Sequence, residues 1–175
     1  MFCVLRFAFL LLTFFAGDEY VSEAVSNRHQ DDTWARMLAL QALCLFDSLG
    51  DAFATDLERF LTDPHTLVEL DLESPLGPEI VRVAATLARQ TWSHHKEYDE
   101  KLARNTAHWS LKRMTPVDRN ILRLGLYELL ERPEVPPKVA LNEAIELARR
   151  FSHNDSPAFV NGVLDAVRKE VLGAE

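Results

Sequence analysis

The side chains able to do acid–base or nucleophilic chemistry are scattered along this chain of 175 residues, with no catalytic spacing among them. His94 and His95 are adjacent, so on a helix they point to different sides and cannot hold one metal ion together. A zinc-binding helix needs histidines four positions apart, with a glutamate. Cys44 lies in an apolar stretch, where a buried thiol is more often inert packing than a nucleophile. The residue types therefore predict a binding module and not an enzyme, with no metal and no cofactor.

Composition narrows the class of binding module. The two cysteines, Cys3 and Cys44, exclude a disulfide framework, and no glycine stands in a phosphate-binding pattern. The formal net charge is −8, and residues 51–75 contribute most of it with seven acidic side chains against Arg59. A negative total makes nonspecific affinity for phosphate weak, without excluding specific RNA binding.

The first thirty residues differ in composition from the rest of the chain. Residues 1–16 are apolar except for Arg6 and Thr13, and the run from Phe7 to Ala16 is shorter than the roughly 20 residues of a membrane span. Three interpretations stay open: a start codon placed too far upstream, a secretion or anchoring segment, and a genuine extra helix. Residues 17–30 are polar and without a period, which is typical of a linker. We therefore divide the chain into an extension, 1–30, and one domain, 31–175.

Helical periodicity runs through the whole of that domain, and no stretch shows the alternation of a strand. The apolar spacing, prolines and capping residues predict an all-α compact bundle of about six or seven helices. The expected helices cover 33–48, 51–62, 78–95, a period from Tyr98 to Leu111, 117–131, 138–151 and the segment after Ser156 as far as Gly173, with a loop at 63–76.

The most distinct helix start is at Thr115-Pro116-Val117-Asp118. Thr115 suits the N-cap, proline the first position, and Asp118 can reach back to the cap. The helix that follows is apolar on more than one side, so it belongs in the middle of the bundle. Gly125 inside it is explained by close helix packing or by a partner's backbone passing near it.

The helix expected at 138–151 has an apolar stripe and a charged face. We place Glu143 and Glu146 on the outer face, in contact with solvent, together with Arg149 and Arg150.

Three sequence stretches resemble one known family. They read VDRNILRLGLYELL from Val117, VPPKVALNEAIELARRF from Val135 and DSPAFVNGVLD from Asp155. They strongly resemble the NusB family of bacterial transcription antitermination factors, with similarity over about residues 33–170 that is weak between 49 and 110. The resemblance implies an all-helical protein of two packed halves. It also implies a cytoplasmic factor, without catalytic activity, metal or nucleotide. Such a factor binds boxA RNA jointly with ribosomal protein NusE, in the RNA polymerase antitermination complex of ribosomal RNA operons.

The resemblance also implies an RNA-binding surface. The family's first helix usually opens with an arginine-rich stretch that grips phosphates, and here only Arg36 remains, with Arg28 just upstream and Asp31 and Asp32 where cations are expected. An aromatic residue that suits base stacking in the family is replaced by Cys44. The other matching RNA-binding candidates are Lys138 for a phosphate, Phe159 for stacking and Asn161 for a base edge. The Asn161 amide is equally suited to holding its loop by hydrogen bonds to the backbone.

Asp118 and Asp155 match acidic positions near the family's NusE-facing surface, and we add Arg119 and Tyr127 as partner-binding candidates. For Arg119, which lies four positions before Arg123 on one helix face, contact with RNA or with Tyr127 and Glu128 stays open as well. Both aspartates are equally explained as residues at helix N-termini, and Phe159 as a core residue. Two functions therefore stay open. One is an antitermination factor that binds RNA with NusE, and the other is a NusB-like interaction module that binds NusE but has lost sequence-specific RNA binding. A third, the RNA-binding domain of a ribosomal RNA methyltransferase, is disfavoured because no catalytic domain follows.

Overall fold

The computed structural model describes residues 28–72, 75–105 and 113–173. The chain divides into two units, residues 1–33 and 34–175, and each is described by itself. In the first unit, residues 28–33 are helical, and the Thr33 hydroxyl donates a hydrogen bond to the His29 carbonyl at 3.0 Å. The apolar segment 1–16 and the expected linker up to residue 27 lie outside the described residues. Residues 28–30, expected in that linker, are helical.

The second unit is built from helices, and none of its described residues forms a strand, which confirms the all-α prediction. The N-terminal helix continues to residue 49 and passes into a short 3-10 turn. The elements that follow are η1 (Gly50–Thr55), α2 (Leu57–Leu61), α3 (Pro64–Glu69), α4 (Pro78–Ser93), α5 (His95–Asn105), α6 (Pro116–Glu131), α7 (Pro137–Phe151) and α8 (Ser156–Leu172).

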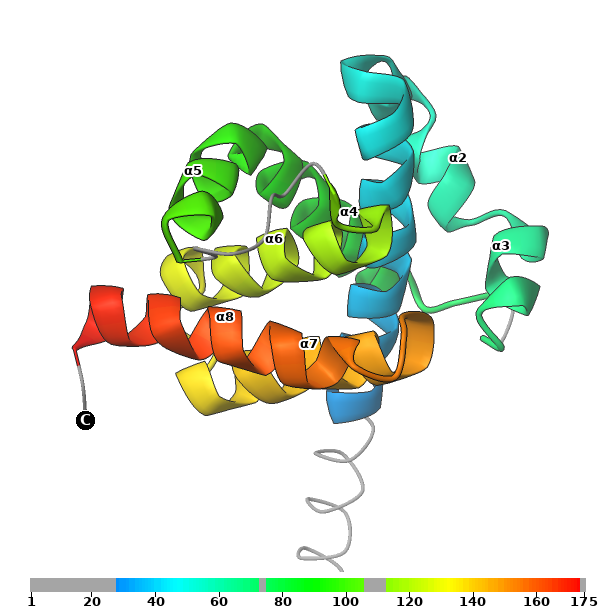
Figure 1. Cartoon of the computed structure of the whole chain (residues 1–175). Coiled ribbons are helices and arrows are strands. Elements are labelled where there is room, and N and C mark those ends of the chain that lie inside the picture. The colour runs from blue at the N-terminus through cyan, green and yellow to red at the C-terminus, as the bar shows by residue number, and fades with distance from the viewer. Residues whose placement is uncertain (1–27, 73–74, 106–112, 174–175) are drawn as a thin grey trace, which may run out of the picture. The chain divides into compact units, whose positions relative to one another are not determined.

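Helix α6 is the centre of this unit, as its apolar residues on several sides predict. It contacts α4, α5, α7 and α8, and Figure 1 shows it between α5 and the antiparallel pair α7 and α8. Its start has the predicted cap: the Thr115 hydroxyl oxygen accepts from the Asp118 backbone N–H at 3.0 Å, and that hydroxyl donates to the Asp118 carboxylate at 2.9 Å. The cap therefore satisfies one of the amide donors that a helix N-terminus leaves without a partner.

Gly125 is explained by close packing of α6 against two neighbours. A Cβ at this position would lie 2.7 Å from Leu164 Cδ1 on α8 and 3.5 Å from Ala144 Cβ on α7. The absence of a side chain lets the three helices approach, which is the first of the two explanations that the sequence allowed.

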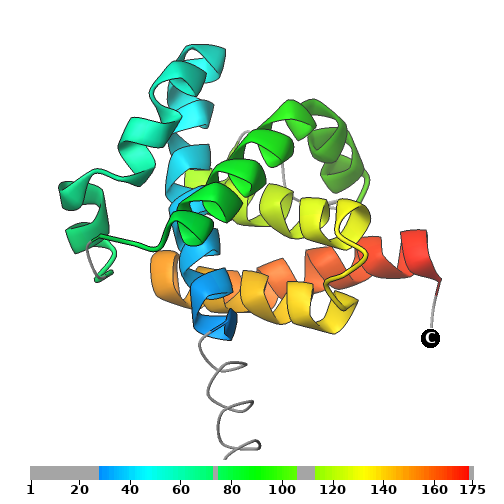
Figure 2. The same ribbon diagram turned by 180° about the vertical axis from the view of Figure 1, so that it is seen from behind.

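The segment after the N-terminal helix differs from its prediction. The single helix expected at 51–62 is split into η1 and α2, and the loop expected at 63–76 contains α3. The short helix forms there because the Asp63 carboxylate accepts from the His65 backbone N–H at 2.8 Å and Pro64 takes the first helical position. Figures 1 and 2 place α2 and α3 on one side of the N-terminal helix, with α5 and most of α6 on the other.

Two other predictions concern helix ends. The period expected from Tyr98 to Leu111 is helical as far as Asn105, and residues 106–111 lie outside the described residues. At the end of α8, Gly173 has a positive φ of 85°, a backbone conformation that favours glycine.

One helix among the described residues, Arg28–Thr55, is long and apolar enough to cross a membrane by length and composition alone. A core helix has the same property, and here the side chains of Leu38, Ala39, Ala42 and Leu43 have no exposed surface. Its apolar face is therefore occupied by the protein core.

Candidate nucleic-acid interface

Arg36, an RNA-binding candidate from the sequence, lies in the core. It is 3% exposed, and its Nε and Nη2 atoms donate to the two oxygens of Glu128 on α6 at 2.9–3.1 Å. Its Nη1 lies 3.5 Å from a carboxylate oxygen of Glu143 on α7. A guanidinium held by two carboxylates inside the bundle does not reach a phosphate, so the structure gives Arg36 a structural role.

The same ion pair overturns the prediction for Glu143. This residue was expected on the outer face of α7, but it is 4% exposed, while Glu146 lies outside as expected. We expected both glutamates in contact with solvent because they are charged and lie outside the apolar stripe of the helix. A carboxylate can nevertheless be buried where a cation neutralises it. Arg132 also lies 3.3 Å from Glu128, which gives the cluster two guanidiniums and two carboxylates.

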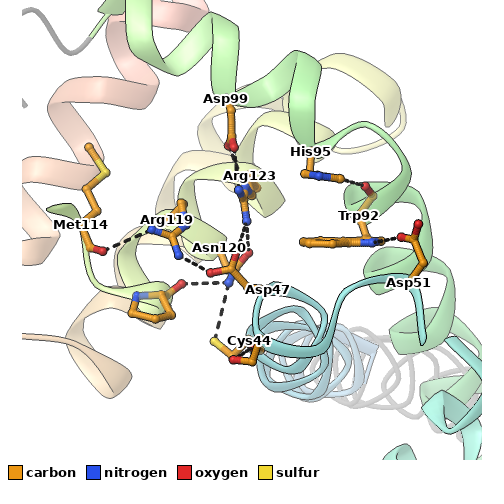
Figure 3. Close-up of polar contacts among 12 residues, drawn as sticks. Cys44, Asp47, Asp51, Trp92, His95, Asp99, Met114, Arg119, Asn120 and Arg123 are labelled. Atoms are coloured by element: carbon orange, nitrogen blue, oxygen red, sulfur yellow. Dashed lines mark hydrogen bonds and ion pairs between the residues drawn. The ribbon is translucent and has the colours of Figure 1, made fainter. Parts of the chain in front are cut away.

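Arg119, a predicted partner-binding residue, forms an ion pair in a second cluster of charged side chains. Figure 3 shows Arg119 and Arg123, one turn apart on α6, pointing at the Asp47 carboxylate from the N-terminal helix. Arg123 Nη1 lies 2.8 Å from Asp47, and its Nη2 lies 2.6 Å from Asp99 on α5. The fully buried Asn120 side chain accepts from Arg123 at 3.0 Å and donates to the Pro116 carbonyl at 2.9 Å.

This cluster shifts the pKa values of Asp47 and Arg123. Burial alone would raise the pKa of Asp47, but hydrogen bonds from Arg119 and Arg123 outweigh it and hold that pKa below its usual range. Burial would also lower the pKa of Arg123, and the bonds to Asp99 and Asp47 raise it instead. Both arginines join the N-terminal helix to α6 through Asp47, and Arg123 also joins α5 to α6 through Asp99.

Cys44 borders this second cluster and behaves as a packing group. Asn120 Nδ2 lies 3.9 Å from its Sγ, and burial raises the pKa of the thiol above its usual value. A thiol with a raised pKa carries little thiolate at neutral pH, so it is a poor nucleophile.

The other predicted partner-binding residues differ in exposure. Asp118 is 8% exposed, and its second carboxylate oxygen accepts from the Ser152 hydroxyl at 2.7 Å. Tyr127 is also 8% exposed and borders a pocket of ≈ 250 Å³ between α4 and the end of α6, and burial raises the pKa of its hydroxyl. Asp155 is exposed at the start of α8, and its carboxylate makes no capping hydrogen bond.

The remaining RNA-binding candidates lie at the surface but not together. Lys138 and Asn161 are exposed and Phe159 is half-buried. Figures 1 and 2 show α7 and α8 running antiparallel, so Lys138 at the start of α7 lies beside the C-terminal half of α8, away from Phe159 near its start. Arg28 is exposed in the first unit.

Sequence reasoning missed the carboxylates of both clusters. A buried cation requires a partner of opposite charge. The helix that carries Arg119 and Arg123 has apolar residues on several sides, which indicates that carboxylates lie opposite these arginines. The signal does not say which acids they are, since Asp47 and Asp99 come from distant segments. Among the described residues, no group of three or more potential metal ligands lies together.

Comparisons with known proteins agree with these helices. A model of the NusB family matches residues 33–169. The transcription antitermination protein NusB of Desulfosudis oleivorans is 38% identical over 141 residues, which cover 81% of this chain and 87% of that protein. The protein of the same name from Solibacter usitatus is 40% identical over 137 residues, covering 78% of this chain and 88% of that protein.

Solved structures share the fold. NusB of T. maritima has a TM-score of 0.65 and 33% identity, over 79% of this chain and 91% of that one. In a crystal structure of antitermination factors NusB and NusE in complex with double-stranded RNA, one chain has a TM-score of 0.64 and 23% identity, over 81% of this chain and 98% of that one. The second likeness is one of fold.

Proposed function

This chain belongs to the NusB family, and we propose that it binds boxA-type leader RNA together with ribosomal protein NusE, in the RNA polymerase antitermination complex of ribosomal RNA operons. The curated relatives carry the name of transcription antitermination proteins, and one solved relative by fold was crystallised with NusE and RNA. This role belongs in the cytoplasm, where the nascent RNA and the polymerase are.

The observation that carries the RNA part of the proposal is the surface of α8. Within the stretch that matches the family, Asn161 presents an exposed amide and Phe159 a half-buried ring. An amide reads a base edge by hydrogen bonds, and an aromatic ring stacks on a base that is unpaired. Lys138 adds an exposed cation for a phosphate at the start of α7.

The partner part of the proposal depends on Asp155. Its carboxylate is exposed at the start of α8, whereas Asp118, Arg119 and Tyr127 are engaged inside the protein or half-buried at its surface. We expect Asp155 to contribute a direct contact with NusE, and Asp118 to hold the surface in shape through Thr115 and Ser152.

The experiment is RNA binding by the full chain, measured by fluorescence anisotropy with and without the host's NusE at two salt concentrations. The probe is the leader RNA of the host's ribosomal RNA operon, with a scrambled RNA as control. We expect preference for the leader that increases when NusE is added. Equal affinity for both RNAs in the presence of NusE contradicts the proposal.

One observation favours the second candidate function, a module that binds NusE without sequence-specific RNA recognition. Arg36 is enclosed in the core, and the segment before it has Asp31 exposed and Asp32 half-buried where the family has cations. Binding to NusE, together with equal affinity for the leader RNA and the scrambled RNA, would support this function.

A further inference from the structure

Within the described part of the protein, neither packing nor backbone conformation requires a glycine at position 162. It lies in the interior of α8 and is exposed, and a Cβ built on it would meet nothing within 4 Å. Its backbone does not have the positive φ that favours glycine, unlike Gly50 and Gly173. Glycine in a helix interior is less favourable than alanine by about 1 kcal/mol. Gly125 costs the same but permits close packing of α6 against α8, whereas Gly162 makes no such contact.

The residues near Gly162 are suited to nucleic acid. Asn161 precedes it, and Phe159 lies three positions before it. Lys169 lies seven positions after it, two turns along the same face of the helix and therefore about 10 Å away along the axis. The Lys169 ammonium is 2.6 Å from the Asp165 carboxylate and its side chain is 55% exposed.

The cation that this part of α8 offers to a phosphate is Lys169. Asp165 is bonded twice, by Lys169 and by Arg168 at 3.0 Å, so these three residues carry one net positive charge. The adjacent Glu170 carboxylate, which accepts from the Asn105 amide at 2.7 Å, offsets that charge. The hydrogen bonds from Lys169 and Arg168 hold the pKa of Asp165 below its usual range. An RNA strand uses both groups, the cation for a phosphate and the ring for stacking on a base.

We propose that Gly162 is the point where an RNA strand passes directly over α8, between base contacts at Phe159 and Asn161 and a phosphate contact at Lys169. This inference rests on the proposed RNA-binding function and adds the path of the strand. The missing side chain lets the sugar–phosphate backbone lie against the helix, and any Cβ would hold it away. The protein therefore keeps a glycine that weakens its own helix, which is typical of a functional site.

The test is Gly162→Ala in the full chain, with stability and RNA binding measured on the same samples. We expect the melting temperature to rise by about 2–4 °C because helix propensity improves. We expect affinity for the leader RNA, with NusE present, to fall about tenfold, while affinity for NusE alone stays unchanged. Lys169→Gln is the companion variant, and it should reduce the slope of log affinity against log salt by about 0.7.

Ala103→Gly on α5 is the control, since Ala103 is also exposed on a helix and lies in the last turn of α5. It should lower the melting temperature and leave RNA affinity unchanged.

Three results overturn the inference. The first is unchanged RNA affinity in Gly162→Ala, and the second is a lower melting temperature, which would mean that the glycine has a role within the fold. The third is loss of NusE binding, which would assign this surface to a protein partner. Absence of leader RNA binding in the unmodified chain would instead contradict the proposed function itself.

Discussion

At the scale of single residues, Arg36 has two possible roles that a stability measurement can distinguish: a buried ion pair and a contact with RNA. Truncating one member of a buried ion pair leaves the other uncompensated, at a cost of about 3–5 kcal/mol. We therefore expect Arg36→Leu to lower the free energy of unfolding by about 3 kcal/mol in urea titrations, because Glu128 and Glu143 lose their shared cation.

Arg59→Leu is the control for that prediction, because the Arg59 side chain is 81% exposed and its ion pair with Asp56 contributes little. It should change the free energy of unfolding by less than about 0.5 kcal/mol. Unchanged stability in Arg36→Leu together with weaker RNA binding would contradict the structural role and restore Arg36 to the RNA surface.

Asp47 gives a pH dependence with a defined sign. Its pKa is lowered in the folded protein, so its contribution to stability is complete above the unfolded pKa of about 3.9 and is lost as the pH falls through the folded value. We expect Asp47→Asn to be about 2 kcal/mol less stable than the unmodified chain at pH 7, because Arg119 and Arg123 lose charged hydrogen bonds. Below about pH 4 that difference should shrink.

The measurement for Asp47 is urea unfolding of both proteins between pH 7 and pH 3. Asp56→Asn, at an exposed ion pair, should show a small difference at every pH. A stability difference between Asp47→Asn and the unmodified chain that is independent of pH would mean that Asp47 acts through packing and not through its charge.

At the scale of helices, Gly125 and Leu164 set how closely α6 and α8 approach. Gly125→Ala improves helix propensity by about 1 kcal/mol but brings a Cβ to 2.7 Å from Leu164 Cδ1, and overpacking costs about 1–3 kcal/mol. We expect a net loss of stability of about 1 kcal/mol. In a Leu164→Ala background the clash is absent, so the same substitution should be neutral or stabilising.

A double-mutant cycle of the two positions, measured by chemical unfolding, checks the Gly125 prediction. Independent effects of the two substitutions would mean that the helices can move apart at no cost, which would leave Gly125 without a packing role.

The helices that could be predicted from sequence are those with local signals. Thr115, Pro116 and Asp118 mark the start of α6, and apolar residues on several sides of that helix indicate its central position, both as observed. Asp63 and Pro64 mark the start of α3 in the same way, but its six residues are too few to show a helical period, so the sequence predicts a loop there.

The candidate site shows the same division. Exposure of Lys138 and Asn161 follows from their faces on α7 and α8, whereas the burial of Arg36 and Glu143 depends on contacts between segments about a hundred residues apart. Residue type alone assigned both of these buried charges to the surface. Pairing between distant segments is a property of the tertiary fold, so periodicity along one helix cannot reveal it.

At the scale of the whole molecule, the balance of charge limits how the protein binds RNA. The net charge is −8, and many arginines are occupied by carboxylates inside the fold or at its surface, among them Arg36, Arg119 and Arg123. The proposed RNA contacts in the second unit include two cations, Lys138 and Lys169. Each phosphate contact with a single strand contributes about 0.7 to the slope of log affinity against log salt.

We therefore expect these two cations to give a slope of about −1.4 with the leader RNA, measured by anisotropy over a range of salt concentrations. Lys138→Gln should reduce that slope by about 0.7, while Lys96→Gln on α5, which removes the same charge from another exposed position, should leave it unchanged. A slope of −4 or steeper would require phosphate contacts by cations outside the proposed surface. Because so few charges take part, most of the RNA affinity should come from stacking, base contacts and NusE, and should persist at physiological salt.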